Sequence, residues 1–320
     1  MRCYCDCGVD SLCTVKRLGY ELIDIQYDYR YVLCTSDRFI NELMGTKYNQ
    51  LKTVGAQMAR LLMALHDRSQ ATFTLRDVQQ ITDLKPASAS DLIYRACRRG
   101  LISRLKRGLF VIVPSELGSA TEYAGNPYLI AQRLAGEAPC FISHASAMEI
   151  HRMVTQPQFV VFASSAKRIH RRTIQQIEFH FVLIKPQHFF GHTKHWVTKQ
   201  ESVNVSDLER TVIDGLHHPD YCGGLTEVAK GLWMRRAEMK PSTLVDYALR
   251  LNVGAVTRRL GYLLELYAIG SDHEWSRLQK TLTATYVALD PLLPKEGKHI
   301  KRWRLQLNVS VEELQGVRTT

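Results

Sequence analysis

The apolar residues between positions 54 and 114 recur with the period of an α-helix three times in succession. The first helix is predicted over residues 54–66, because its apolar positions stand three or four residues apart. These positions are Met58, Leu61, Leu62 and Leu65. A second helix follows Thr74, and its buried side consists of Leu75, Val78 and Ile81. Asp77 stands three residues after Thr74, which is the spacing of a capping box at a helix N-terminus.

The third helix is predicted within "PASASDLIYRACRRG", residues 86–100, and its two sides differ in polarity. Pro86 suits the first turn of a helix, and Gly100 suits the position just after the last turn. The apolar side consists of Ala89, Leu92, Ile93, Ala96 and Cys97. The opposite side consists of Ser88, Ser90, Tyr94, Arg95 and Arg98. This pattern predicts a helix that packs on the first two and exposes its basic side.

Two short strands follow the third helix. The segments "LISRL" and "LFVIV" flank the turn Lys106-Arg107-Gly108, and Pro114 closes the second strand. Three helices followed by a basic hairpin are typical of a winged helix-turn-helix domain, whose third helix can lie in the major groove of DNA.

The third helix and the hairpin therefore supply the candidate DNA-binding residues. We expect base edges to be contacted by Ser88, Ser90, Tyr94 and Arg95. We expect phosphate groups to be contacted by Arg98, Arg104, Lys106 and Arg107. Base contacts read the sequence, whereas phosphate contacts position the protein without reading it. Two alternatives stay open, namely that the basic side is only a solvated face, or that the domain binds another protein.

Beyond residue 126 the pattern predicts both helices and strands. Helices are predicted in "NPYLIAQRL" and "FISHASAMEIHRM", and strands in "QFVVFAS" and "IEFHFVLI". The clearest helix is "VSDLERTVIDGLHHP", where Ser206 and Glu209 have capping-box spacing and Pro219 ends the helix. Its apolar stripe consists of Leu208, Val212, Ile213 and Leu216. Further helices are predicted over 225–234, 241–251, 253–267 and 274–282, and a late strand in "KRWRLQLNV".

These elements predict an α+β fold, with an N-terminal winged helix-turn-helix followed by a larger mixed α/β domain that has a helical C-terminal half. The predicted boundaries are 1–43 for a cysteine-rich extension, 44–114 for the winged helix, 115–126 for a linker and 127–320 for the larger domain. Met44 opens a segment that could itself start the chain, so we expect the extension to be dispensable.

Charge narrows the class of partner. The chain of 320 residues carries a net charge of +11. Residues 51–114 alone hold eleven Lys or Arg and four Asp, so most of the excess lies in the predicted winged helix. Excess positive charge favours a polyanion such as nucleic acid. No run of eighteen apolar residues and no signal-peptide pattern occurs, so we expect a cytoplasmic protein without a membrane partner.

Five of the eight cysteines stand in the first 34 residues, at positions 3, 5, 7, 13 and 34. Structural zinc sites usually use pairs with C-x2-C spacing, whereas this segment has C-x-C-x-C. We therefore expect no metal there and, in a reducing cytoplasm, no disulfide framework.

Several of these segments together resemble a known family. They are "RGLFVIVP", "YLIAQRL", "CFISHASAMEIHRM" and "VNVSDLERTVIDGLHHPDYCGGLTEVAKGL". They resemble the AbiEi antitoxins of type IV toxin–antitoxin systems, which are linked to phage defence by abortive infection. The resemblance covers roughly residues 44–309, and its most specific parts are "SHASAMEIH" and "SDLERTVIDGLHHPD".

The resemblance implies a protein that represses its own operon by binding repeats in the promoter. It also implies that the protein counteracts a nucleotidyltransferase-like toxin through its C-terminal domain, without a stable complex. The family's DNA-binding role maps onto the third helix and the hairpin. For the matched Glu209, Arg210, Thr211 and Asp214 we expect structural roles: a helix cap, a salt bridge and a buried turn contact.

The sequence contains little evidence of a catalytic site. His188, His192 and His195 could share a helix face and hold a metal, but a Pro and a Gly nearby favour a loop. The arrangement of Asp290 with Glu296-Gly-Lys298 faintly resembles that of Mg²⁺-dependent nucleases. No Walker A loop, G-x-S-x-G or H-E-x-x-H motif occurs. We expect no catalysis, metal or cofactor, although a nuclease targeted by the winged helix and a plain transcription factor remain open alternatives.

Overall fold

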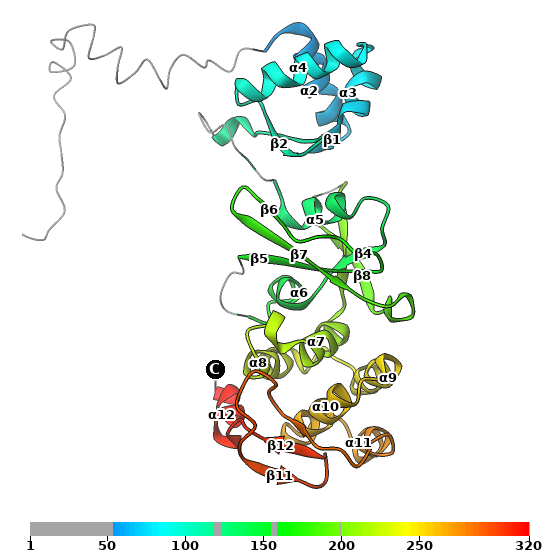
Figure 1. Cartoon of the computed structure of the whole chain (residues 1–320), viewed down its shortest axis with the longest axis vertical. Helices are drawn as coiled ribbons and strands as arrows, with labels where there is room; N and C mark the ends of the chain where they lie inside the picture. The colour runs from blue at the N-terminus through cyan, green and yellow to red at the C-terminus, as the bar shows by residue number, and fades with distance from the viewer. Residues whose placement is uncertain (1–53, 118–122, 124, 155–158, 199, 320) are drawn as a thin grey trace, which may run out of the picture. The chain divides into compact units, whose positions relative to one another are not determined.

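A computed structural model describes residues 54–117, 123, 125–154, 159–198 and 200–319 (Figure 1). These residues belong to one compact unit that spans residues 52–320. The predictions for the cysteine-rich segment 1–43 and for Met44 lie outside the described residues.

The three predicted N-terminal helices are confirmed. They are α2 (Ala56–Asp67), α3 (Leu75–Thr82) and α4 (Pro86–Arg98). Their buried side chains form one apolar cluster with the first strands, and its helical members are Met58, Leu61, Leu65, Val78, Ile81, Ala89, Ile93 and Ala96. The predicted capping box is present at α3, because the Thr74 hydroxyl accepts from the Asp77 N–H and the Asp77 carboxylate accepts from the Thr74 N–H. A local sequence signal is sufficient here because both partners lie within one turn.

The wing is a three-stranded antiparallel sheet in the order β1-β3-β2, with β1 at Thr72–Thr74, β2 at Ile102–Lys106 and β3 at Leu109–Ile112. The hairpin of β2 and β3 was predicted, but β1 was not, since three residues are too few to show an alternation. A β-bulge between Arg104 and Lys106 precedes the turn, and Gly108 takes a φ of 77° there. This left-handed conformation favours glycine.

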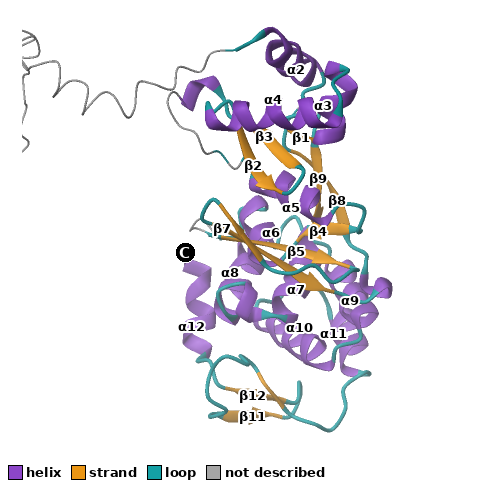
Figure 2. Ribbon diagram, turned by 45° about the horizontal axis from the view of Figure 1, so that its top comes forward, coloured by secondary structure: helices purple, strands orange, loops and turns teal. Residues whose placement is uncertain are grey.

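The central layer is a six-stranded mixed sheet in the order β6-β7-β5-β4-β9-β8 (Figure 2). The strands are β4 (Cys140–Ile142), β5 (Val160–Ser165), β6 (Arg172–Ile174), β7 (Ile177–Leu183), β8 (His192–Trp196) and β9 (Ser202–Ser206). Strand β5 runs parallel to β7, and β4 runs parallel to β9, whereas the other neighbours are antiparallel. Strands β5 and β7 confirm the two predicted strands, and the other four were missed.

The two faces of this sheet are covered by different helices. Helix α5 (Pro127–Ala135) packs on one face, where alternate strand residues such as Val161, Phe179 and Val205 join its apolar cluster. Helix α6 (His144–Ile150) packs on β5 at the other face, beside Phe162 and Val182. The wing joins the first cluster, because its residues Leu105, Leu109 and Val111 pack with Leu129 and Ile130 of α5.

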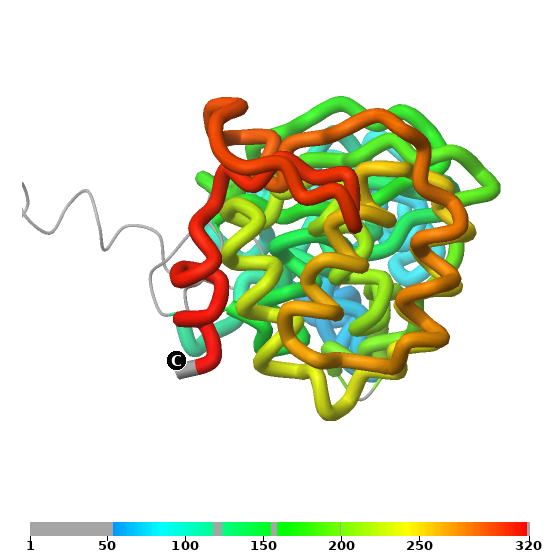
Figure 3. Tube along the Cα trace, turned by 90° about the horizontal axis from the view of Figure 1, so that it is seen from below, coloured from blue at the N-terminus to red at the C-terminus, as the bar shows by residue number. Residues whose placement is uncertain are grey.

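The helical part after the sheet contains α7 (Leu208–His217), α8 (Leu225–Arg235), α9 (Pro241–Leu251), α10 (Gly254–Leu266) and α11 (Asp272–Gln279). The chain then forms the small sheet β10-β12-β11 (Val287–Ala288, Leu305–Leu307 and Lys298–Ile300) and ends in α12 (Val311–Gly316). Figure 3 shows this last segment, coloured orange to red, returning over the helices. One large apolar cluster joins α7–α11 with Trp303, Leu305 and Leu314.

Two local predictions were wrong in their boundaries. Residue Ser206 does not cap α7, since it is the last residue of β9, and Asp207 caps the helix by accepting from the Arg210 N–H at 2.7 Å. The helix predicted in "FISHASAMEIHRM", with entry through Ser143 or His144, is confirmed as α6, which begins at His144, although the strand β4 before it was missed. The late strand covers only Leu305–Leu307 of "KRWRLQLNV".

No helix in the described part of the chain is long and apolar enough to cross a membrane.

Substitution of Gly261 by Ala should destabilise the protein, because a Cβ at this position of α10 would overlap the ring of buried Trp303. Overpacking of this kind costs roughly 3 kcal/mol when the neighbour cannot move. Urea unfolding of Gly261→Ala should therefore show a clearly lower midpoint than the wild type. The matched control is Gly316→Ala in α12, where an added Cβ meets nothing within 4 Å. This variant should be neutral or slightly more stable, and equal effects of the two substitutions would contradict the packing argument.

Candidate nucleic-acid interface

The predicted base-reading residues all lie on the exposed side of α4. The helix buries Ala89, Ile93 and Ala96 against α2 and α3, so the remaining arc of its surface faces solvent. Around that arc, helical geometry places five exposed residues in the order Ser90, Tyr94, Arg98, Arg95 and Ser88. An exposed arc of this polarity can enter a groove of DNA without any rearrangement of the domain.

Arg95 is held in place in the free protein by an acidic neighbour. Its Nη2 lies 2.5 Å from Oδ2 of Asp91, one turn earlier on α4, and both side chains are more than half exposed. Exposed ion pairs contribute only about 0–1 kcal/mol. The guanidinium can therefore exchange Asp91 for a base edge at little cost. In addition, Lys85 precedes α4 without a side-chain cap, and Pro86 occupies its first turn, so the helix N-terminus can still receive a phosphate.

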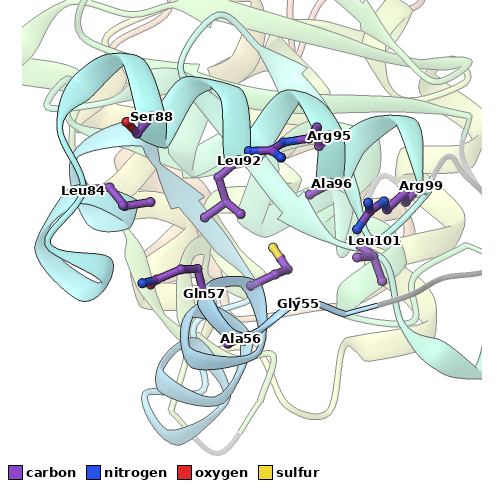
Figure 4. Close-up of a pocket in the computed structure, with 11 residues that line it drawn as sticks. Gly55, Ala56, Gln57, Leu84, Ser88, Leu92, Arg95, Ala96, Arg99 and Leu101 are labelled. Carbon is purple, nitrogen blue, oxygen red and sulfur yellow. The ribbon is translucent and has the colours of Figure 1, made fainter.

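A cavity borders the same helix. It has a volume of about 440 Å³ and lies between α4 and the start of α2 (Figure 4). Ser88, Leu92 and Arg95 line it from α4, Arg99 lines it just after that helix, and Gln57 lines it from α2. Two of the predicted base-reading residues, Ser88 and Arg95, thus line this cavity.

The three basic residues of the wing lie together at the end of the hairpin. Arg107 is exposed in the turn, and the exposed Arg104 donates from Nε to the Lys106 carbonyl across the bulge, at 3.4 Å. Lys106 is half-buried, and its Nζ donates to the Arg133 carbonyl of α5 at a long 3.5 Å. Arg107 and Arg104 are therefore available to phosphates, whereas Lys106 must first release α5.

A second basic segment lies next to the wing and was not among the predicted site residues. Residues 167–172, "KRIHRR", lead into β6. Burial, and to a smaller degree the positive charge of Arg172, lower the pKa of Lys106. The side chain of Gln175, just after β6, also donates to the Ser103 hydroxyl of β2. The charge run was visible in the sequence, but only the fold places it beside the wing.

The residues that carry the resemblance in α7 have structural partners. Arg210 and Asp214 form a buried ion pair, with Nε and Oδ1 2.8 Å apart. Burial raises the pKa of the Asp214 carboxyl, and the charge of Arg210 opposes this shift. Glu209 accepts the Lys240 N–H just before α9, and the Thr211 hydroxyl donates to the Asp207 carbonyl. The expected salt bridge and turn contact are thus present, but Glu209 does not cap α7 as expected, since its side chain links α7 to the start of α9.

Neither of the weak catalytic arrangements comes together. His188 lies in a 3-10 turn (Pro186–His188), whereas His192 and His195 belong to β8, where His192 stacks on Phe141. Asp290 accepts the N–H groups of Leu225 and Leu292, so both of its oxygens hold backbone in place. Among the described residues, no three His, Cys, Asp or Glu side chains are arranged to hold a metal.

Histidines do gather elsewhere, between α7 and the central sheet. His144 stacks edge-on against Tyr221, His218 lies parallel to the same ring, and His217 and His218 have ring centroids 4.1 Å apart. Burial lowers the pKa of each of these histidines, and for His217 the value falls to about 4. Neighbouring imidazoles and Arg210 lower the pKa values of His144 and His217 further. These rings are therefore neutral in the folded protein near neutral pH.

The N-terminal part of the described residues thus has the architecture of a winged helix. The comparisons with known proteins agree. Residues 60–113 match the model of a family described as "Transcriptional regulator, AbiEi antitoxin". The resemblance noted in the sequence is confirmed for this segment.

The fold extends beyond the matched segment. The crystal structure of the Rv2827c protein from Mycobacterium tuberculosis is similar, with a TM-score of 0.62 at 16% identity. The similarity covers 84% of this chain and 96% of that chain, so the whole succession of a winged helix and a mixed α+β region is shared. The comparison with curated proteins gives no match.

The histidine cluster predicts a loss of stability in acid. The folded-state pKa of His217 is about 4, whereas an unfolded histidine titrates near pH 6.5. Above pH 6.5 both states are neutral and stability is complete; as the pH falls toward about 4, only the unfolded state takes up the proton. After allowance for solvent screening, we expect His217 to account for a loss of roughly 1–2 kcal/mol. Urea unfolding measured from about pH 7 to about pH 4.5 tests this.

In the His217→Gln variant, the free energy of unfolding should fall less between about pH 7 and about pH 4.5. His195→Gln, a change at an exposed residue of β8, should leave the pH dependence unchanged. The same pH profile in both variants and the wild type would refute the assignment to His217.

Proposed function

We propose that this protein is the DNA-binding autorepressor and antitoxin of a type IV toxin–antitoxin system, in which it counteracts a nucleotidyltransferase-like toxin. The observation that carries the proposal is the winged helix: it matches AbiEi regulators over residues 60–113 and exposes a polar, basic side of α4. Its partner is double-stranded DNA, in particular repeats in its own promoter, which it meets in the cytoplasm. The toxin is opposed without a stable complex.

We propose that base reading and phosphate contact fall to different residues, and the geometry supports this division. Arg95 can leave its exposed pair with Asp91 and form two hydrogen bonds with a guanine, supported by Ser88, Ser90 and Tyr94 on the same arc. Arg98, Arg104, Lys106 and Arg107 neutralise phosphates and fix the register. We add the segment 167–172 to the phosphate-contacting surface, since Arg172 lies close enough to Lys106 to influence its charge.

Two other functions make different use of the same domain. A nuclease would cut the DNA that the winged helix binds, but Asp290 is engaged with backbone and Glu296 is exposed. Incubation of labelled promoter DNA with protein and Mg²⁺ distinguishes these functions, because a repressor shifts the DNA and leaves it intact. A plain transcription factor would have no toxin gene beside its own.

DNA affinity should fall steeply with salt, by a slope of about −0.9 per phosphate neutralised. Arg95→Ala should weaken binding by about 1–3 kcal/mol at one base position and relax specificity there. Lys106→Ala should instead weaken binding to all sequences similarly and reduce the salt slope by about 1. Mobility shifts with promoter fragments, single-base variants of them and a salt series measure both effects.

Lys194→Ala provides the control, because this exposed lysine lies on β8 and is not among the proposed DNA-contacting residues. Its affinity and slope should equal those of the wild type. Equal and unselective losses from Arg95→Ala and Lys106→Ala would contradict the division between base reading and positioning, and no shift even in dilute buffer would refute DNA binding.

Neutralisation of the toxin should be separable from DNA binding. Co-expression of the full chain should restore growth in cells arrested by a nucleotidyltransferase-like toxin from the adjacent gene. The double variant Arg95→Ala/Arg107→Ala should still restore growth while it loses repression of a promoter–reporter fusion, since a type IV antitoxin does not act through the operator. Failure of the wild-type chain to restore growth would leave a regulator without antitoxin function.

A further inference from the structure

The further inference concerns a cavity remote from α4. It has a volume of about 260 Å³ and lies between α7, the end of β7 and the start of α10. It is lined by His144, Val182, Leu183, Ile184, Lys185, His188, Arg210, Asp214, His217, His218, Leu251 and Val253. A volume of this size lies just below the range of about 300–1,000 Å³ typical of ligand pockets, so it suits a small ligand.

The charges around this cavity are mostly of one sign. Two cations, Lys185 and Arg210, face it against the single carboxylate of Asp214, and the four imidazoles that line it are neutral near neutral pH and can donate hydrogen bonds. Val253 immediately precedes α10, so the positive end of that 13-residue helix also borders the cavity. Hydrogen-bond donors and positive potential dominate, and the complementary ligand is an anion.

Arg210 is held rigidly on one wall. Its Nε binds Asp214, and its Nη1 donates to the carbonyls of His188 and Phe190, at 2.9 and 3.3 Å. The guanidinium also lies 4.4 Å from the centre of the Phe190 ring. Gly191 keeps this arrangement compact, because an added Cβ there would come within 2.9 Å of the Arg210 Cβ. A fixed guanidinium loses little entropy when it binds an oxyanion, so the site is preorganised.

Asp214 adds a requirement to the ligand. Its residue is only 3% exposed, and its Oδ2 is buried without a hydrogen-bond partner among the described residues. A buried acceptor left unpaired costs about 1–3 kcal/mol. A ligand that donates a hydrogen bond to this oxygen would satisfy it, while its negative charge would face Arg210 and Lys185.

His144 supplies a further donor to the same wall. The Ser164 hydroxyl donates to Ser143 Oγ, and Ser143 Oγ lies 2.8 Å from Nδ1 of His144. The Ser143 hydroxyl can therefore donate to Nδ1, which leaves the proton of the neutral ring on Nε2.

We propose that this cavity binds a small phosphate-bearing anion, either hydrogenphosphate or a phosphomonoester of a small polyol. Lys185 and Arg210 bind the phosphate oxygens. The remaining hydroxyl of hydrogenphosphate, or a hydroxyl of the polyol, donates to Asp214 Oδ2. Sulfate has the same shape as phosphate but carries no proton near neutral pH, so the free carboxylate oxygen selects against it.

The test is isothermal titration of the full chain with inorganic phosphate, sulfate and glycerol 3-phosphate near neutral pH. Phosphate or the ester should bind at least tenfold more tightly than sulfate, since a tenfold ratio corresponds to about 1.4 kcal/mol. Lys185→Gln, a change at an exposed residue of the rim, should weaken binding about tenfold. Lys194→Gln on β8 and the DNA-face variant Arg95→Ala should bind like the wild type, which separates this site from the DNA surface.

Asp214→Asn tests the selectivity. A carboxylate only accepts hydrogen bonds, whereas the asparagine side chain also carries an NH2 group that donates them. In a variant that still unfolds cooperatively, the preference for phosphate over sulfate should disappear. Should this variant fail to fold, Lys185→Gln and the phosphate-to-sulfate ratio of the wild type decide the matter. Absence of saturable phosphate binding, equal affinity for sulfate, or binding unaffected by Lys185→Gln would each overturn the proposal, whatever the result for DNA.

Discussion

The buried pair of Arg210 and Asp214 is the interaction on which the arrangement of sheet and helices depends. Arg210 extends from α7 and holds two carbonyls of the segment between β7 and β8, while Asp214 neutralises it from within the same helix. A buried charge is tolerated only when it is paired and hydrogen-bonded, and removal of one partner costs about 3–5 kcal/mol. The pair therefore fixes the distance between the edge of the central sheet and the helical part, and with it the cavity between them.

At the winged helix the governing constraint is different, since its stability comes from an apolar interior and its function from exposed charge. Burial of Ala89, Ile93 and Ala96 turns the rest of α4 outward. The small size of two of these three residues lets α4 approach α2 and α3 closely. The same packing therefore both stabilises the domain and presents Arg95 and Tyr94 to a partner.

Local signals in the sequence were sufficient for the helices, but they did not reveal most of the strands. The capping box of Thr74 and Asp77 was predictable because its members lie within one turn. The strand Cys140–Ile142 was missed because three residues carry no alternation, and its partners lie about 20 and 60 positions away along the chain. Because β9 ends at Ser206, this residue is not free to cap α7, and Asp207 caps the helix instead. A local pattern cannot show where the preceding strand ends.

The candidate DNA residues were read from the sequence because a single helix and a single hairpin carry them. The phosphate cavity was not, because four separate segments supply its walls and only the fold brings them together. The proximity of residues 167–172 to the wing was also not predicted, because only the fold brings these two segments together. The charge run is plain in the sequence, but its distance from Lys106 is a property of the tertiary structure.

The apolar cluster shared by the wing and α5 has a consequence for how the chain can be divided. Leu105, Leu109 and Val111 belong to the hairpin of the DNA-binding part, yet they are covered by residues of the part that follows, among them Leu129 and Ile130. A truncation at Pro114 would expose these three side chains to water. The resulting apolar surface on an otherwise cationic fragment would favour aggregation. The winged helix and the part that follows it therefore stabilise each other. A chimera that replaces one of them must keep apolar residues that complement the shared cluster.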